Sequence, residues 1–518
     1  MPRTRREFLA DVGQGMVVAA VGIEVARDLG LVRCLADETG DLLLFGRIEP
    51  LVCLMQETPA NRLLPTLMER LRSGTDLRQL IAAGALANAR TFGGEDYVGF
   101  HTMMALAPAF HMAQELPAEI QPLPVFKVLY RNTNRIQEHG GRKGEVLRQV
   151  KVETLPSGCQ GGEALREAVR QRDVNGAERT FASLTRGSID EAFEQLLLAV
   201  QDATEVHRVV LPYRAWDMLG IIGNDHAHTL LRQSVRYCVQ AEAWSRPVSQ
   251  DDPRTLLPKL LDEYQLLGRS PGNRQAEDDW VDQLCSVIFK STPVDAARAA
   301  ASALADGMVP EAVGEAVTLA ANQLILRDTG RTPRDEVRGK PIGSVHGDSI
   351  GVHACDSANA WRNMALVGSA RNCFAGLILG AYQVALDRTA RGGNFLNWSP
   401  LPVQRHLDEI KATEPEILLH EADEAIRGNL QAKASAVIHR YGELGLPSRP
   451  VFDLLLRYAV SEDGSLHAEK FYRTVSEEFA STRPAFRWRH LVALARVTAS
   501  EFGHPAEGIE ETRALLRS

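Results

Sequence analysis

Residues 77–89 read LRQLIAAGALANA, a run in which alanine and leucine predominate. Both residues are strong helix formers, so this run favours a helix over a strand. The segment directly before it, Ser73-Gly74-Thr75-Asp76, interrupts the pattern, and either Thr75 or Asp76 can cap the helix that follows. We therefore predict two helices within residues 60–90, separated at residues 73–76.

The same helical periodicity continues through the chain on both sides of this run. A further helix is expected from Tyr97 to Leu116, kinked or broken at Pro108, and another from Pro122 to Arg135. Helical patterns then occupy about 187–244, 254–327, 348–390 and 414–516. The expected fold class is all-α, a multi-helix bundle or an irregular helical array with little or no sheet.

Glycine-rich and polar stretches divide this helical pattern into regions. The expected division is a signal or anchor at 1–30, a helical region at 31–145, a Gly-rich linker or insertion at 146–185, a central helical region at 186–330 and a C-terminal helical region at 331–518. A short strand is an alternative expectation near Val150 and Val152.

Composition excludes several classes of function. The 518 residues carry a formal net charge of −8, and no basic cluster is interleaved with aromatic residues, so we expect no nucleic-acid partner. No segment after the N-terminus reaches the roughly 18 apolar residues of a transmembrane helix, so no span is expected beyond a possible N-terminal anchor. None of the seven cysteines forms a C-x-x-C pair, which argues against a thiolate zinc site.

The N-terminus carries the most specific short motif. Thr4-Arg5-Arg6-Glu7-Phe8-Leu9 resembles the twin-arginine export signal, and a modest apolar stretch follows from Met16 to Ile23. We expect the twin-arginine export machinery to carry the chain to the periplasm or another exported location, where it is released or stays tethered to the membrane. That route moves folded proteins, often with a cofactor already inserted. The alternative is an amphipathic N-terminal helix in a cytoplasmic protein.

Residues 344–357 form the first group of candidate site residues. Glycines and small polar residues, with His346 among them, precede a helix that is expected to begin near Asp348. On that helix His353 and Asp356 lie three residues apart and share a face. An imidazole and a carboxylate so placed can bind a metal or relay a proton. The alternative is a capped helix whose histidine bonds a neighbouring carbonyl.

Residues 223–236 form the second group. His226 and His228 stand at the expected start of a helix, and Arg232 and Arg236 continue the His228 stripe at four-residue spacing. One histidine and two arginines at a helix start suit an anionic substrate or a cofactor carboxylate. The alternative is a solvated or salt-bridged face.

Single histidines also occur at the starts of other expected helices. His101 follows Gly99-Phe100, and His467 precedes Lys470 in an H-x-x-K pair whose lysine suits an anion or a carbonyl group. Taken alone, a histidine on an apolar helix such as His101 is more often a core residue. The H-E-x-x-H, Walker, G-x-S-x-G and dinucleotide motifs are absent.

Separated histidine motifs on successive helices, with H-x-x-K near the C-terminus, resemble the questin oxidase-like family. Members of that family are helical and histidine-rich, and the group is linked to oxidative ring opening of aromatic polyketides. The resemblance implies site roles for His101, His226, His353, and His467 with Lys470.

Together these features predict an exported helical protein with a polar, histidine-lined cavity that acts on a small molecule as an oxidoreductase. It would bind a redox cofactor or a transition metal such as iron, copper or zinc, with metal ligands drawn from His226, His228, His346, His353 and His467. His353, Asp356, His228 and Arg232 are the expected catalytic residues, and Arg236 and Lys470 the expected cofactor-binding residues. Two alternatives stay open, a non-enzymatic helical scaffold or binding protein and a cofactor-free questin oxidase-like oxygenase.

Overall fold

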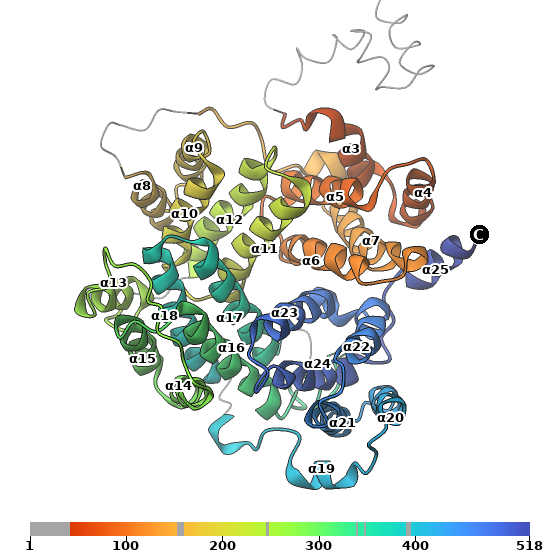
Figure 1. Ribbon diagram of the computed structural model, residues 1–518. Helices are drawn as coiled ribbons and strands as arrows, with labels where there is room; N and C mark the ends of the chain where they lie inside the picture. Colours follow the sequence, from red (N-terminus) through yellow and green to blue (C-terminus); the bar gives the residue numbers. More distant parts are fainter. Residues whose placement is uncertain (1–41, 153–159, 245–247, 338–339, 346–348, 390–394) are drawn as a thin grey trace, which may run out of the picture.

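The computed structural model describes residues 42–152, 160–244, 248–337, 340–345, 349–389 and 395–518. Within these ranges the chain is built of α-helices and short 3₁₀ helices, with isolated β-bridges and no strand, so the predicted all-α fold is confirmed (Figure 1). No described helix has the length and apolar character needed to cross a membrane. Residues 1–41, which carry the predicted export signal, and His346 lie outside the described residues.

The first helices follow the predicted pattern closely. Two helices occupy residues 60–90 as expected, and Asp76 caps the second by accepting a hydrogen bond from the backbone N–H of Gln79, whose side chain accepts from the N–H of Asp76. Pro108 lies inside the next helix and does not break it. The bounds are α3 (Glu49–Glu57), α4 (Ala60–Arg72), α5 (Leu77–Phe92), α6 (Tyr97–Gln114) and α7 (Pro122–Glu138).

The predicted Gly-rich linker at 146–185 is helical over most of its described length. It contains α8 (Gly161–Arg170) and α9 (Val174–Leu184), which pack against each other and against α10 (Ile189–Val200) and α12 (Ala227–Ala241). Leu165, Val169 and Phe181 are fully buried in these contacts. Their apolar faces outweigh the glycines of the two helices, which lie in the first turn of each: Gly161 and Gly162 in α8 and Gly176 in α9.

Helices from the central and C-terminal regions complete the array. Their bounds are α11 (Val206–Ile222), α13 (Pro253–Glu263), α14 (Asp278–Lys290), α15 (Pro293–Ala305), α16 (Pro310–Arg327), α17 (Ile350–Val367), α18 (Ala370–Thr389), α19 (Gln404–Glu409), α20 (Pro415–Arg427), α21 (Gln431–Glu443), α22 (Arg449–Ser461), α23 (His467–Ser481), α24 (Trp488–Glu501) and α25 (Ile509–Arg517).

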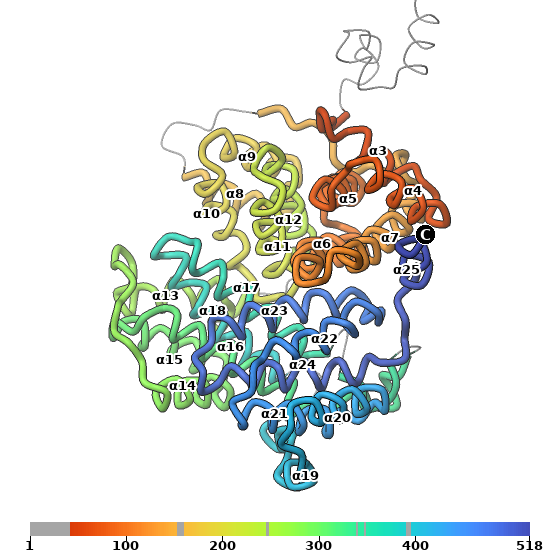
Figure 2. The backbone as a smooth tube through the Cα atoms, turned by 45° about the vertical axis from the view of Figure 1, so that its right-hand side comes forward, coloured from red at the N-terminus to blue at the C-terminus, as the bar shows by residue number. Residues whose placement is uncertain are grey.

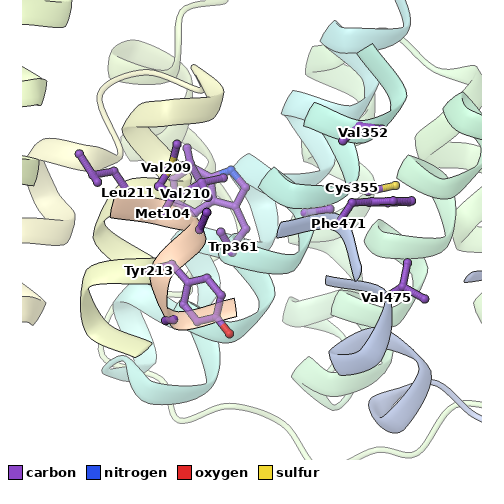
Figure 3. Close-up of a cluster of buried hydrophobic side chains, with 14 of the residues drawn as sticks. Met104, Val209, Val210, Leu211, Tyr213, Val352, Cys355, Trp361, Phe471 and Val475 are labelled. Atoms are coloured by element: carbon purple, nitrogen blue, oxygen red, sulfur yellow. The ribbon is translucent and has the colours of Figure 1, made fainter. Parts of the chain in front are cut away.

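Four helices from distant parts of the chain pack in a ring at the centre of the molecule (Figure 1, Figure 2). Helix α6 packs on α11, α11 on α17, α17 on α23, and α23 back on α6. Figure 3 shows apolar side chains of these four helices, among them Met104 of α6, Val209 of α11, Trp361 of α17 and Phe471 of α23, all of them buried. Burial of this kind stabilises the ring by about 1.5–3 kcal/mol for each large side chain.

Candidate functional site

Each helix of the central ring contributes one histidine from within its first five residues. These are His101 of α6, His207 of α11, His353 of α17 and His467 of α23. Around the ring, the imidazole centroids are 4.7 Å apart for His101 and His207, 5.8 Å for His207 and His353, 5.1 Å for His353 and His467, and 5.2 Å for His467 and His101. We call these four side chains the histidine ring.

The four imidazoles face one another as two pairs. The Nε2 atoms of His101 and His207 are 3.2 Å apart, and those of His353 and His467 are 3.1 Å apart. Two imidazole ligands of one metal ion, each at about 2.1 Å and at 90–110° to one another, have their nitrogens roughly 3.0–3.4 Å apart. Each pair therefore has the spacing of two ligands that share an ion.

The other ring nitrogen of three of these histidines contacts an oxygen that can only accept a hydrogen bond. The Nδ1 of His101 is 2.7 Å from the Tyr97 carbonyl, and that of His467 is 3.0 Å from the Ser465 carbonyl. The Nδ1 of His207 is 2.7 Å from a carboxylate oxygen of Glu205. Each Nδ1 must therefore carry the proton, and in the neutral imidazole Nε2 is left with a bare lone pair.

Two facing lone pairs repel each other unless a positive charge lies between them. For the pair of His101 and His207 that charge is either a proton, which makes one ring an imidazolium, or a metal ion. Burial disfavours the proton, because it lowers the pKa of His101 and of His467 well below the usual histidine value, and the nearby Lys470 ammonium acts in the same direction. The N-terminal ends of the four helices add positive potential, which disfavours a proton and a metal cation alike.

The four histidines of the ring differ in exposure. His101, His207 and His467 are buried, whereas His353 is partly exposed. As the side chains stand, no group of three or more His, Cys, Asp or Glu residues among the described part of the chain is placed to hold a metal ion. The arrangement is thus two facing pairs and not one closed set of ligands.

A buried polar network extends from the histidine ring between α11, α17 and α23. Thr474 donates a hydrogen bond of 2.8 Å to Asp356, and the Arg214 guanidinium contacts Thr474 at 3.4 Å and Glu477 at 3.3 Å. Burial raises the pKa of Asp356, although Lys470 and Thr474 oppose the shift. Burial also lowers the pKa of Lys470 to about 8, which leaves that amine able to change protonation state near neutral pH.

The structure brings several of the predicted site residues together. His353 and His467 form one of the two pairs, and His101, which the family resemblance singles out, belongs to the other. Asp356 lies one turn after His353 on α17, and Lys470 lies one turn after His467 on α23. The charges of Asp356 and Lys470 act on one another. The helix of His353 begins at Ile350 with Ser349 as its cap, slightly later than predicted.

His226 and His228 lie apart from the histidine ring. They stand at the start of α12, which returns antiparallel to α11, so the length of α11, about 24 Å, separates them from His207. The His226 ring contacts Phe45 edge-on, and the His228 ring stacks on Phe181. Burial lowers the pKa of His228 to about 4.

The two predicted anion-binding arginines are engaged by carboxylates of the protein itself. Arg232 donates to Glu178 at 2.7 Å and to the Arg148 carbonyl at 2.7 Å. Arg236 pairs with Glu178 at 2.9 Å and with Glu95 at 2.5 Å. These contacts join α12 to α9 and to the loop before α6. They correspond to the salt-bridged face that was the alternative interpretation of the His228, Arg232 and Arg236 stripe.

His207 is the ring member that the sequence patterns described above did not assign to the site. The four histidines share a local signature, because each follows an apolar residue at the start of a helix, as in Gly99-Phe100-His101, Glu205-Val206-His207, Gly351-Val352-His353 and Ser465-Leu466-His467. That recurrence is visible in the sequence and would have found His207.

Comparison with known proteins gives no assignment. No protein-family model, no curated protein and no solved structure matches this chain.

Proposed function

We propose that this protein is a metal-dependent oxidoreductase whose metal ion is held by His101, His207, His353 and His467. The observation that carries the proposal is the facing Nε2 atoms, 3.2 and 3.1 Å apart, of four histidines, three of which place Nδ1 against an oxygen acceptor. In known metal sites, an oxygen that accepts a hydrogen bond from the other ring nitrogen fixes the tautomer of the ligating histidine.

The spacing of the whole ring fits this assignment. Imidazoles bound at about 2.1 Å have their centroids roughly 3.2 Å from the metal, and neighbouring centroids then lie roughly 4.5–5.3 Å apart. Three of the four neighbouring distances, 4.7, 5.1 and 5.2 Å, fall in that interval, and the fourth is 5.8 Å. If the His207 and His353 rings moved slightly closer together, the two pairs would form one set of four metal ligands.

Four neutral imidazoles select a borderline metal. Imidazole suits iron, copper and zinc, whereas magnesium and calcium prefer oxygen ligands. Of these, iron and copper supply one-electron and oxygen chemistry, which zinc does not. The proposed activity therefore requires iron or copper, and a zinc-loaded protein would point to hydrolytic or structural use.

The residues beside the ring have roles in handling the substrate. Lys470 and Asp356 form an acid–base pair one turn from the ligands, so they can exchange a proton with a small molecule bound on the exposed His353 side. The resemblance to the questin oxidase-like family makes an aromatic molecule the proposed substrate class.

A second candidate is a cofactor-free oxygenase that uses the same ring. Within the described ranges, no three potential metal ligands lie close enough to bind one ion. Each facing pair of histidines can share one proton in place of a metal ion. In that case Lys470 and the ring histidines would act as general bases toward the substrate.

Metal analysis of the purified protein decides between these candidates. The full chain would be purified without added metal and compared with His467→Gln and His490→Gln, two buried histidines that are each 3% exposed. We expect near-stoichiometric iron or copper in the wild-type protein and in His490→Gln, and at least a tenfold loss in His467→Gln. Metal-free wild-type protein that takes up neither iron nor copper would refute the metal proposal.

We also propose export by the twin-arginine route, on the strength of Arg5 and Arg6 in their motif. Cell fractionation of the wild-type chain and of the double variant Arg5→Lys, Arg6→Lys tests it. Retention of the variant alone in the cytoplasm supports the proposal, and equal distribution of the two chains contradicts it.

A further inference from the structure

A groove opens between α10, α11 and α17, at the opposite ends of α11 and α17 from the histidine ring. Its volume is about 490 Å³, which is within the range of small-molecule sites. Trp216 lines the groove and follows His207 by nine residues on α11, so about 14 Å of helix separates the groove from the ring. We call it the α11–α17 groove.

The ends of two helices give this groove a negative potential. Leu219 in the last turn of α11 and Leu366 in the last turn of α17 both line it, and neither last turn contains a basic residue. The C-terminal end of a helix carries the negative end of its dipole and favours cations. The start of α10 also lies at the groove, where Asp190 and Glu191 in its first turn oppose the positive end of that helix.

The side-chain charges add to the potential of the helix ends. Asp190 and Asp217 line the groove, and no lysine or arginine of the described residues does. Asp217 lies 3.3 Å from Arg214, which also pairs with Glu477 at 3.3 Å, and Glu477 pairs with Arg473 at 2.7 Å. These four charges balance one another, so the exposed Asp190 carboxylate supplies the excess negative charge.

The groove also presents an indole and an apolar rim. Trp216 is half-buried, and Phe193 stacks on its ring with centroids 4.4 Å apart, which holds the indole in place. Leu366 and Val367 are each 51% exposed at the edge of the groove. An indole attracts a cation through its negative face, and an aliphatic rim suits the carbon atoms that surround a substituted ammonium group. The negative potential disfavours an anion.

We propose that the α11–α17 groove binds a small organic ammonium compound, with its charged group near Trp216 and Asp190 and its carbon atoms against Leu366 and Val367. The groove shares no residue with the histidine ring. This inference therefore stands or falls independently of the proposed function.

A charged ligand and its uncharged isostere test the proposal. The probes are choline and 3,3-dimethylbutan-1-ol, which have the same shape but differ in the positive charge. Each is titrated into the full chain at low ionic strength, and binding is measured by isothermal titration calorimetry. We expect choline to bind and the alcohol to bind at least about tenfold more weakly. Equal affinities, or no binding of choline, would overturn the inference.

Two variants locate the binding site. Asp190→Asn removes the excess charge and should weaken choline binding by about fivefold or more. Asp279→Asn is the matched control, because Asp279 of α14 is likewise an exposed aspartate at the second position of its helix, and it should leave the affinity unchanged.

The second variant, Gly220→Leu, fills the groove without altering its charge. Gly220 lines the groove, and a Cβ there meets no atom within 4 Å, so the helix can accept the leucine without moving. We expect choline binding to be lost in this variant. Wild-type affinity in either Asp190→Asn or Gly220→Leu would place choline elsewhere on the protein and overturn the inference.

Discussion

His353 and His467 face each other through their Nε2 atoms at 3.1 Å, although 114 residues separate them in the chain. They come from α17 and α23, which pack side by side in the central ring of helices. Their mutual position is set by how closely α17 packs against its neighbours, so substitutions that displace this helix should alter the pair without touching either imidazole.

Gly351→Ala should displace α17. A Cβ at this position would lie 2.6 Å from Cγ1 and 2.7 Å from the backbone nitrogen of Ile325, and backbone atoms cannot move aside as a flexible side chain can. We expect a loss of about 1–3 kcal/mol in the free energy of unfolding and at least tenfold weaker metal binding. Urea unfolding and metal titration measure the two effects.

Gly220→Ala is the matched control for that change. Gly220 is also helical, but a Cβ there meets no atom within 4 Å. Alanine should therefore raise the free energy of unfolding by about 0.5–1 kcal/mol and leave metal binding unchanged. Equal effects of the two substitutions would contradict the packing argument.

His490 should make the protein less stable in acid. Burial lowers its pKa to about 4, with nearby Arg362 adding to the shift and Glu478 opposing it. Below pH 6.5 the unfolded chain takes up a proton on this residue that the folded chain does not, so stability falls as the pH drops from about 6.5 to about 4. The shift corresponds to about 3 kcal/mol.

Urea unfolding of the metal-free protein at pH 7.5 and pH 4.5 measures this effect. The free energy of unfolding should decrease between pH 7.5 and pH 4.5 in both proteins. Because His490→Gln lacks the titrating group, its decrease should be smaller than that of the wild-type protein by about 2–3 kcal/mol. Parallel pH profiles for the two proteins would show that His490 does not carry the acid sensitivity.

Arg232→Met should affect stability and not the histidine ring. Arg232 and Glu178 are 3% and 8% exposed, and removal of the arginine leaves a buried carboxylate with only Arg236 to pair it. We expect a loss of about 3 kcal/mol in the free energy of unfolding, with metal stoichiometry unchanged. Arg513→Met, which breaks an exposed ion pair with Glu510, should cost less than about 1 kcal/mol. Loss of metal in Arg232→Met would restore the predicted ligand-binding role of this residue.

Thr474→Val should destabilise the polar network beside the ring. The substitution keeps the shape of the side chain but leaves buried Asp356 without its 2.8 Å hydrogen bond, at an expected cost of about 1–3 kcal/mol. Thr474→Ser retains the hydroxyl and should recover most of this loss. Thermal unfolding of the wild-type protein and of the valine and serine variants measures the loss of stability. Equal stability of the two variants would contradict the assigned hydrogen bond.

Local sequence signals predicted the helices well because the information needed lies within each segment. The cap at Asp76 and the helix that starts at Tyr97 were both predicted from spacing alone, although Pro108 does not break that helix. The segment at 146–185 was different, because its glycines suggested a linker while Leu165 and Phe181 depend on packing partners in α10 and α12 to become a core.

The candidate site was predictable only in part, because its members are brought together by the packing of distant helices. His353 and His467 were named as ligands, but His228 was grouped with them, since a single sequence does not show that α12 starts at the opposite end of α11 from His207.

The wide separation of the ring histidines also governs when the centre can be assembled. During translation His101 and His207 leave the ribosome early, whereas His467 emerges only after nine-tenths of the chain has been synthesised. A nascent chain that ends before His467 therefore holds at most one of the two pairs and three of the four histidines. The full set of four histidines exists only once α23 has docked, so the proposed metal ion would enter in the compartment where folding is completed.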